Sequence, residues 1–161
     1  MKQLSLFEKT VLDLKLFMKK WFKAYEDKNE IFFKNLYTQD SYHFGTGKDE
    51  ILYGDKEIQK QLKRDWSQIH SCTFQTQHMN IRPMHFLHNG PYNSAWVTCE
   101  TIPIVTNLQS ETHKLELLRC TFVLSRLSTV QSHWQVAHSH VSWAHSTQED
   151  GQSYPREVLI D

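Results

Sequence analysis

The sequence lacks a net charge, because 18 lysines and arginines are balanced by 18 aspartates and glutamates. No excess positive field draws the chain to nucleic acid or to an acidic membrane surface, so we expect neither as a partner. It also lacks any run that approaches the roughly 20 apolar residues of a membrane span. The first residues contain no long apolar run and no small-residue cleavage site, which predicts no signal peptide. A cytoplasmic protein is the resulting expectation.

Cysteine is scarce, and the three present are odd in number and form no CxxC pair. They are Cys72, Cys99 and Cys120, and each lies in a segment that alternates like a strand. This pattern favours buried, reduced thiols over a disulfide framework. Repeats and low-complexity segments are absent as well. At 161 residues we predict one domain over residues 1–146, followed by a polar tail over 147–161.

Apolar residues recur with helical spacing in the first part of the chain. The clearest stripe is rich in aromatic residues and has lysines on its opposite side, which is typical of a core-facing helix. Its last members, Trp21 and Tyr25, could also contact a ligand. Asp55 can cap a later helix. Three helices are predicted in this way, over residues 5–27, 29–37 and 55–70, with a short strand over 41–47.

From Cys72 onward the period changes from 3.6 to 2, which indicates strands. Short turns between these segments require antiparallel neighbours. Helices followed by a meander of long strands predict an α+β fold, a cone-shaped half-barrel with three N-terminal helices packed on a curved antiparallel sheet. The mouth of such a cone is a natural pocket. The four long strands are predicted over residues 72–87, 94–105, 113–127 and 133–145.

The last strand has an unusual composition. One face is apolar at its start and carries two imidazoles and a hydroxyl at its end, which is typical of a strand that runs from a core into a polar recess or a subunit interface. A period of 2 places on that face Trp134, Val136, His138, His140 and Ser142.

Two hairpin registers remain open for this strand. If Phe122 pairs with His138, the imidazoles share the apolar face with Cys120 and Leu124. If Phe122 pairs with Val141, the polar groups gather on one face, and we favour this register for that reason. A slip of one residue exchanges the faces. The second register collects Arg119, Thr121, Val123, His138, His140 and Ser142.

The two histidines suggest three roles. They could ligate a metal with a third ligand from Glu100 or His78. They could instead hydrogen-bond with neighbouring polar groups to join the sheet or a dimer interface. A pocket role is the third, with His140 as the candidate proton carrier. We predict no metal and no cofactor, and we assign no other catalytic residue. Arg119, between Leu118 and Cys120, is expected to be buried beside an anion such as Glu100, Asp40 or a ligand carboxylate.

Several motifs resemble the nuclear transport factor 2-like superfamily in its SnoaL-like branch, and also the association domain of calcium/calmodulin-dependent protein kinase II. The most specific is the pattern Trp-x-x-x-His-x-His-x-Ser over residues 134–142, which is typical of that branch. The resemblance covers about residues 7–145 and implies the cone fold. The other matching segments are Phe22-Lys-Ala-Tyr-Glu-Asp27, Leu36-Tyr-Thr-Gln-Asp40, Phe44-Gly-Thr-Gly-Lys-Asp-Glu50 with Gly54, Trp66, Ser94-Ala-Trp-Val97 and Leu118-Arg-Cys-Thr121.

The chemistry of the relatives does not transfer as readily. In the ketosteroid isomerases the resemblance implies a carboxylate base near Gly45 and a tyrosine near Trp21. The association domain implies arginines at Val141 and near Phe122. None of these four residues can do the corresponding work. We therefore favour a small-molecule-binding or oligomerisation module with a ligand pocket in the cone. The alternative is a small isomerase, cyclase or hydratase that uses a pocket histidine as acid and base.

The predicted partners are a small-molecule ligand, either a carboxylate or a ring compound, and a second copy of the chain. A homodimer is expected because the second face of the sheet would expose apolar residues such as Trp96 or Trp143 with Ile102 and Ile104. The resemblance places Trp66 at the mouth of the cone. The ligand-binding residues predicted are Trp21, Tyr25, Tyr42, Trp66, Glu100, Arg119, His138 and His140.

Overall fold

The computed structural model describes residues 4–84, 92–126 and 133–144. The chain begins with helix α1, Leu6–Glu26, which confirms the helix predicted over 5–27. Ser5 starts it with a capping box, since the Ser5 hydroxyl accepts from the Glu8 amide and the Glu8 carboxylate accepts from the Ser5 amide at 2.7 Å. These bonds satisfy backbone groups that a helix end leaves without partners. No helix in these described ranges is long and apolar enough to cross a membrane.

The second helix is shorter than predicted. Helix α2 spans Glu30–Phe33, because Lys34 has an extended backbone and strand β1 begins at Tyr37. The expected helix over 29–37 is therefore wrong in its second half. Because the helix ends at Phe33, strand β1 can begin at Tyr37, before the start of the strand predicted over 41–47. Strand β1 spans Tyr37–Phe44.

Helix α3, Gly54–Gln68, confirms the third predicted helix but not its cap. The Tyr53 amide donates to the Glu57 carboxylate at 2.8 Å, and Asp55 only lies in the first turn. Gly54 has φ of 72°, and a Cβ there would lie 2.8 Å from the Gln39 carbonyl oxygen. Only glycine fits at position 54, because any other residue would be strained at this φ and its Cβ would clash with Gln39.

The C-terminal end of α3 is capped from a distance. Lys28 Nζ donates to the Trp66 carbonyl at 2.8 Å and to the Ile69 carbonyl at 2.7 Å. A cation at this end of a helix meets both its free carbonyls and the negative end of its dipole.

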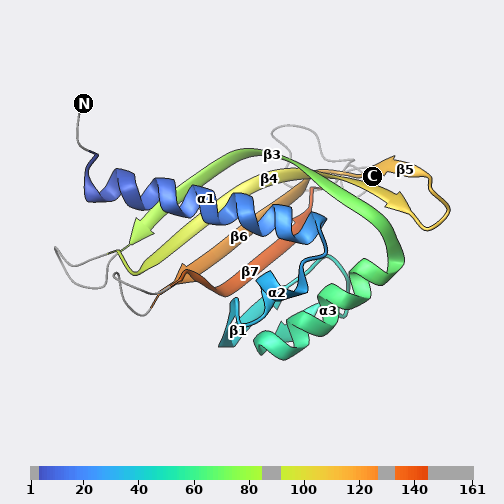
Figure 1. The fold of residues 1–161 in the computed structure, drawn as a ribbon, viewed down its shortest axis with the longest axis horizontal. Helices are drawn as coiled ribbons and strands as arrows, with labels where there is room; N and C mark the ends of the chain where they lie inside the picture. The colour runs from blue at the N-terminus through green and yellow to red at the C-terminus, as the bar shows by residue number, and fades with distance from the viewer. Residues whose placement is uncertain (1–3, 85–91, 127–132, 145–161) are drawn as a thin grey trace, which may run out of the picture.

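One curved sheet with the order β2-β1-β7-β6-β4-β3 faces the helices (Figure 1). The part from β3 to β7 is antiparallel, as predicted, while β1 runs parallel to β7, so the sheet is mixed and unclosed. The predicted strand over 113–127 is divided in two, and its shorter piece, β5, pairs only with β4. The turn predicted at 128–132, most of that at 88–93, and the tail lie outside the described residues. The remaining strands are β2 Ile51–Tyr53, β3 Ile69–Met84, β4 Ser94–Asn107, β5 Thr112–Lys114, β6 Leu118–Ser125 and β7 Gln135–Trp143.

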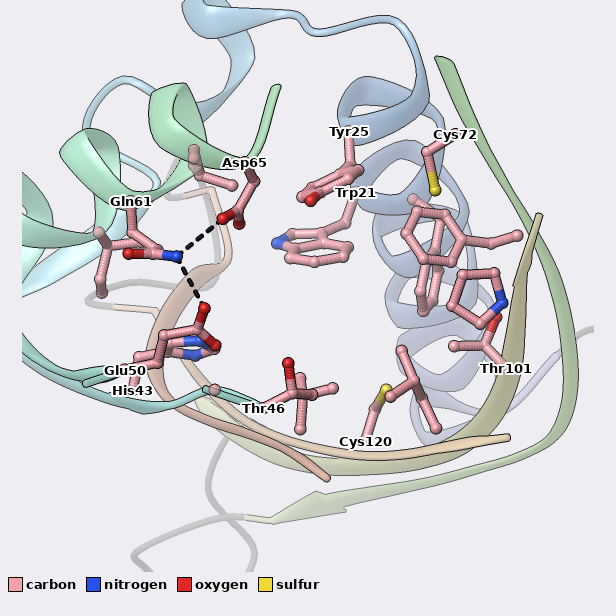
Figure 2. A pocket seen from close by; sticks show the side chains of 18 of the residues that line it. Trp21, Tyr25, His43, Thr46, Glu50, Gln61, Asp65, Cys72, Thr101 and Cys120 are labelled. Carbon is pink, nitrogen blue, oxygen red and sulfur yellow. Dashed lines mark hydrogen bonds between the residues drawn. The ribbon is translucent and has the colours of Figure 1, made fainter. Parts of the chain in front are cut away.

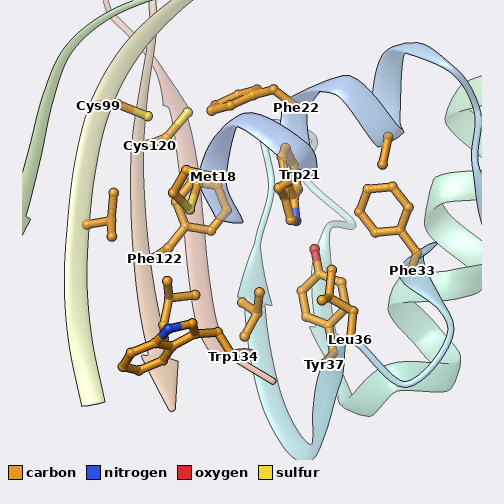
Figure 3. Packing of buried hydrophobic residues seen from close by; sticks show 14 of the residues in the cluster. Met18, Trp21, Phe22, Phe33, Leu36, Tyr37, Cys99, Cys120, Phe122 and Trp134 are labelled. Atoms are coloured by element: carbon orange, nitrogen blue, oxygen red, sulfur yellow. The ribbon is translucent and has the colours of Figure 1, made fainter. Parts of the chain in front are cut away.

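The core lies between α1 and the concave inner face of the sheet. The Trp21 ring is central, with Phe33 at 5.6 Å and Phe122 at 5.2 Å between ring centres (Figure 3). Met18 and Leu124 are fully buried beside them. Edge-to-face contacts of this kind add to the hydrophobic burial of each ring. The second half of the apolar stripe predicted on the first helix is therefore core, whereas Phe7 near its start is 46% exposed.

Strand β7 contains a bulge that reverses its faces. Val136 pairs with Leu124, but His138 pairs with Val123, so Ala137 is the extra residue. Trp134 and Val136 consequently face the core, and the residues that follow change sides. Neither predicted register holds, because Phe122 pairs with Ser139. The favoured register, with Phe122 opposite Val141, differs from the observed pairing by two residues. A shift of two residues keeps every side chain on its face, so the prediction that the histidines share a face with Thr121 and Val123 is confirmed.

Candidate functional site

A cavity of about 300 Å³ lies between α1, α3 and the inner face of the sheet. This volume is at the lower end of the range for small-molecule sites. Aromatic and aliphatic side chains from both helices and six strands form most of its wall, and polar groups gather at one end (Figure 2). Its aromatic wall consists of Trp21, Phe22, Tyr25, Tyr37, Phe74, Phe122 and Trp143.

Two carboxylates meet at the polar end. Gln61 Nε2 donates to Glu50 Oε1 at 2.9 Å and to Asp65 Oδ1 at 2.7 Å, so one amide bridges both groups (Figure 2). Arg64 lies outside them and contacts Glu50 at 3.3 Å and Asp49 at 2.6 Å. The arginine therefore pairs mainly with Asp49 and to a lesser degree with Glu50, and it forms no ion pair with Asp65, which is the least compensated of the three carboxylates.

The environment of Asp65 raises the pKa of its carboxyl to about 6. Burial is the largest cause, followed by the negative charge of Glu50. Three other interactions lower the pKa of Asp65, but by less than burial and Glu50 raise it. They are the hydrogen bond from Gln61, the charge of Arg64 and the hydrogen bond from the Tyr25 hydroxyl. Both forms of this carboxyl are thus present near neutral pH, which is the property that a general acid or base needs.

Glu50 owes its place to Gly45. A Cβ built at Gly45 would coincide with the Glu50 carboxylate, so the glycine leaves the space that this side chain fills. The Glu50 carboxylate also accepts from the Gly47 amide at 2.9 Å. Glu50 thus combines a contact within the turn with a position in the cavity wall.

His43 lines the same end of the cavity from β1. Its Nδ1 lies 2.7 Å from the hydroxyl of Ser139, which is 1% exposed. Burial lowers the pKa of His43 to about 4, and the Glu50 charge opposes this only in part. The ring is therefore neutral at physiological pH, and Ser139 fixes its orientation.

One donor in the wall lacks a well-formed hydrogen bond. Trp21 is 8% exposed, and its indole Nε1 makes no hydrogen bond with any described residue. The Tyr37 hydroxyl points toward it without reaching hydrogen-bond geometry (Figure 3). In Figure 2 this nitrogen faces the gap beside Asp65 and the Tyr25 hydroxyl. Tyr37 is only a weak acceptor for this buried N–H, so a better acceptor placed in that gap would bind favourably.

Of the residues predicted to bind a ligand, the structure brings Trp21 and Tyr25 into the cavity wall. Trp66 packs behind them, with its ring 5.8 Å from that of Tyr25. The others lie on the opposite surface of the sheet, which we call the outer face and define by the side of Trp96, Glu100 and Val123. Register and burial place there Tyr42, Glu100, Arg119, His138 and His140.

Arg119 is exposed, which corrects the expectation that it is buried with an anion. It pairs across the ladder with Glu100, at a position whose inward neighbours are Cys120 and Leu118. Alternation along a strand buries the neighbours and leaves the arginine outside, so flanking apolar residues do not predict its burial. Among the residues described, no group of three or more histidines, cysteines or carboxylates is placed to hold a metal.

The sequence reasoning missed His43, Gln61 and Asp65. A signal for the last two exists in α3, because both stand at helical spacing within the apolar stripe of Ile58 and Leu62. Polar residues at positions that face a core are unusual unless they line a site. No comparable signal separates His43 from the other nine histidines.

Residues 14–146 match the model of the SnoaL-like domain. The chain belongs to the SnoaL-like domain family. No curated protein matches the sequence.

Solved structures share the fold of this SnoaL-like chain at low identity. A candidate dehydratase of the nuclear transport factor 2-like family from Streptomyces avermitilis is 14% identical, with a TM-score of 0.71 and coverage of 86% of this chain and 98% of that one. A candidate calcium/calmodulin-dependent protein kinase II association domain from Xanthomonas campestris is 15% identical, with a TM-score of 0.68 and coverage of 83% and 86%. A protein from Catenulispora acidiphila in complex with S-DNPA is 11% identical, with a TM-score of 0.66 and coverage of 84% and 93%. The resemblance to the SnoaL-like branch and to the association domain is thus confirmed.

Proposed function

We propose that this SnoaL-like protein binds a small, uncharged ring compound in the cavity and that Asp65 exchanges a proton with it. The observation that carries the proposal is a carboxyl with a pKa near 6 at the polar end of an aromatic cavity. A flat ring fits walls made of Trp21, Tyr25 and Phe122. The volume of about 300 Å³ suits a ligand of one or two fused rings.

The negative charge of the cavity favours one of the two ligands expected from the sequence, the ring compound, over the other, a carboxylate. Glu50 and Asp65 would repel a ligand carboxylate, and none of the described residues that line the cavity is a lysine or arginine. A ring that carries a hydroxyl or a ketone suits this end better. The hydroxyl could donate to an ionised Asp65, and the ketone could accept from a protonated Asp65 or from the Trp21 indole.

The arrangement suits water elimination or isomerisation, in which one group removes a proton from carbon and another protonates an oxygen. Asp65 can hold or release the proton, and the Tyr25 hydroxyl faces it. His43 is neutral and held by Ser139, so it is suited to a hydrogen bond with the ligand rather than to carrying charge. This reading replaces the expected acid–base role of His140, which is exposed on the outer face.

The test uses the tryptophan indole signals in a two-dimensional nitrogen–proton NMR spectrum while 2-naphthol is titrated. The chain has five tryptophans. Binding in the cavity shifts the signal of Trp21, whose N–H faces the gap beside Asp65. Trp134, which donates to Asp13 at 2.8 Å, and Trp96, on the outer face, are internal controls that stay in place. A shift of Trp96 without Trp21, or no shift, would contradict the proposal.

A pair of probes tests the proton exchange. Binding of 2-naphthol should strengthen as pH rises through about 6, while binding of 2-tetralone, a ketone, should weaken over the same interval. The expected change is about fivefold for each, the difference between a neutral and a charge-assisted hydrogen bond. Asp65→Asn should remove both dependences. Equal pH profiles for the two probes would rule out Asp65 as the partner.

We also propose that two copies associate through the outer face. Trp96, Tyr53 and Ile51 are exposed on it, together with the ring cluster of Tyr42 and His138. A two-fold axis would bring this patch against its own copy. Trp143, the alternative to Trp96 in the expected patch, pairs with Leu118 on the inner face and lines the cavity, which favours Trp96 for this role.

A further inference from the structure

Two of the three thiols are direct neighbours across the sheet. Cys99 on β4 pairs with Cys120 on β6, and both side chains are on the inner face, 3% and 5% exposed. Figure 3 shows the two sulfur atoms turned toward each other. Both thiols are free. Nothing in the proposed function uses this pair.

Backbone geometry already allows a bond between them. Residues directly opposite in an antiparallel ladder have Cα atoms about 4.5 or 5.5 Å apart. Disulfides span Cα separations of roughly 4.4–6.8 Å, so the pair is within reach. Closure draws together the two Cβ atoms, which are about 4.5–5.5 Å apart in such pairs and roughly 3.8 Å apart in a disulfide. Cys72 is different, because it pairs with Val105, which lies roughly 20 Å along β4 from Cys99 at about 3.3 Å per residue. That distance excludes Cys72 from a bond with either of the other thiols.

We propose that Cys99 and Cys120 form a peroxide-sensitive dithiol that closes reversibly to a disulfide in the cavity wall. Cys120 lines the cavity, which gives a small oxidant a route to a pair that is otherwise buried. Hydrogen bonding between the thiols lowers the pKa of Cys99 and, together with burial, raises that of Cys120. Cys99 is therefore the thiolate that attacks first.

The chemistry balances with hydrogen peroxide as oxidant. The Cys99 sulfur attacks one peroxide oxygen, the O–O bond breaks, and the departing hydroxide takes a proton to become water. This leaves Cys99 as a sulfenic acid. The Cys120 sulfur then attacks the Cys99 sulfur, the S–O bond breaks, and the hydroxyl leaves with the Cys120 proton as a second water. Two thiols are oxidised and one peroxide is reduced to two waters.

The test treats the folded, full-length chain with one equivalent of hydrogen peroxide, then denatures it and titrates free thiols. The count should fall from three to one per chain. A peptide map without reductant should contain one cross-link, between Cys99 and Cys120, and dithiothreitol should restore all three thiols. Retention of three thiols, or their loss to sulfinic acid without a cross-link, would overturn the proposal.

Two variants identify which cysteines form the cross-link. Cys72→Ala should still lose two thiols, because Cys72 takes no part, and Cys99→Ala should form no cross-link. A link to Cys72 in the wild type would also refute the assignment. The wild-type peptide map decides the matter by itself if Cys99→Ala does not fold.

Discussion

Asp65 and His43 lie at the same end of the cavity, and burial moves their pKa values in opposite directions. Burial disfavours the charged form of each group, which is the ionised form of an acid and the protonated form of a base. The pKa of Asp65 therefore rises to about 6 and that of His43 falls to about 4. At neutral pH the site holds a neutral imidazole beside a carboxyl that readily gains or loses a proton.

The stability of the fold should report this shift. The pKa of Asp65 rises from 3.8 to about 6, so the folded chain holds the extra proton between these values. Its stabilising contribution is full below about pH 4 and is lost as pH rises through about 6. The full shift corresponds to about 3 kcal/mol, and solvent screening of a half-buried carboxyl leaves about 1 kcal/mol. Asp65→Asn should thus increase the free energy of unfolding by that amount near pH 7.5 and by little near pH 4.

Urea denaturation at the two pH values measures this difference. His43 acts in the opposite sense, because its lowered pKa makes the chain less stable as pH falls from 6.5 toward about 4. The comparison of variant with wild type at each pH cancels that contribution. An equal effect of Asp65→Asn at both pH values would contradict the raised pKa.

Ser139 offers a second test at this scale. Ser139→Ala removes the partner of His43 Nδ1 from a position that is 1% exposed. An unsatisfied buried polar group costs about 1–3 kcal/mol, and thermal unfolding should show a loss in this range. Ser142→Ala on the outer face of the same strand is the matched control, expected to stay within about 0.5 kcal/mol. Equal effects of the two changes would show that His43 does not depend on Ser139.

Among the elements, α3 depends on a residue far from it in sequence. Lys28→Met removes the donor that both the Trp66 and Ile69 carbonyls share. Loss of a helix cap costs about 1 kcal/mol, and the exposed Lys60→Met change within α3 should cost much less. Denaturation midpoints measure the difference. An equal, small effect of both changes would mean that water replaces the lysine at these carbonyls.

How far the sequence predicts an element depends on whether its signal is local. The spacing of Leu14, Met18 and Trp21 predicts α1 because a helix repeats regularly along its whole length. The faces of β7 could not be predicted, because one extra residue at Ala137 moves His138 and His140 away from the core side of Val136. A bulge is decided by the neighbouring strands, and the strand's own alternation does not reveal it.

The candidate site could be predicted only in part for the same reason, because some of its residues have no local signal in the sequence. Trp21 and Tyr25 were identified because they belong to a periodic helix. Glu50 and Asp65 come from a turn and a separate helix, and only the folded chain joins them through Gln61. Their significance lies in burial and mutual repulsion, which depend on tertiary structure.

At the scale of the whole molecule, the two faces of the sheet have different proposed tasks. The inner face surrounds the cavity, and the outer face is proposed to join two copies. Trp96→Asp should shift sedimentation at tens of micromolar protein toward the monomer, because a charge would replace an apolar contact at the interface. Leu12→Asp on α1 is the control, since Leu12 and Trp96 are both 51% exposed. A wild-type monomer, or equal effects of both changes, would contradict this association.

The proton exchange proposed for Asp65 requires that its carboxyl is divided between the protonated and the ionised form near neutral pH. Carbon-detected NMR of side-chain carboxyl groups, titrated over about pH 3–8, measures this property without knowledge of the ligand. The signal absent from Asp65→Asn identifies the residue. We expect a midpoint at about 6 for Asp65. A midpoint near the ordinary value of 3.8 would show a fully ionised carboxylate at neutral pH and would contradict its role in proton exchange.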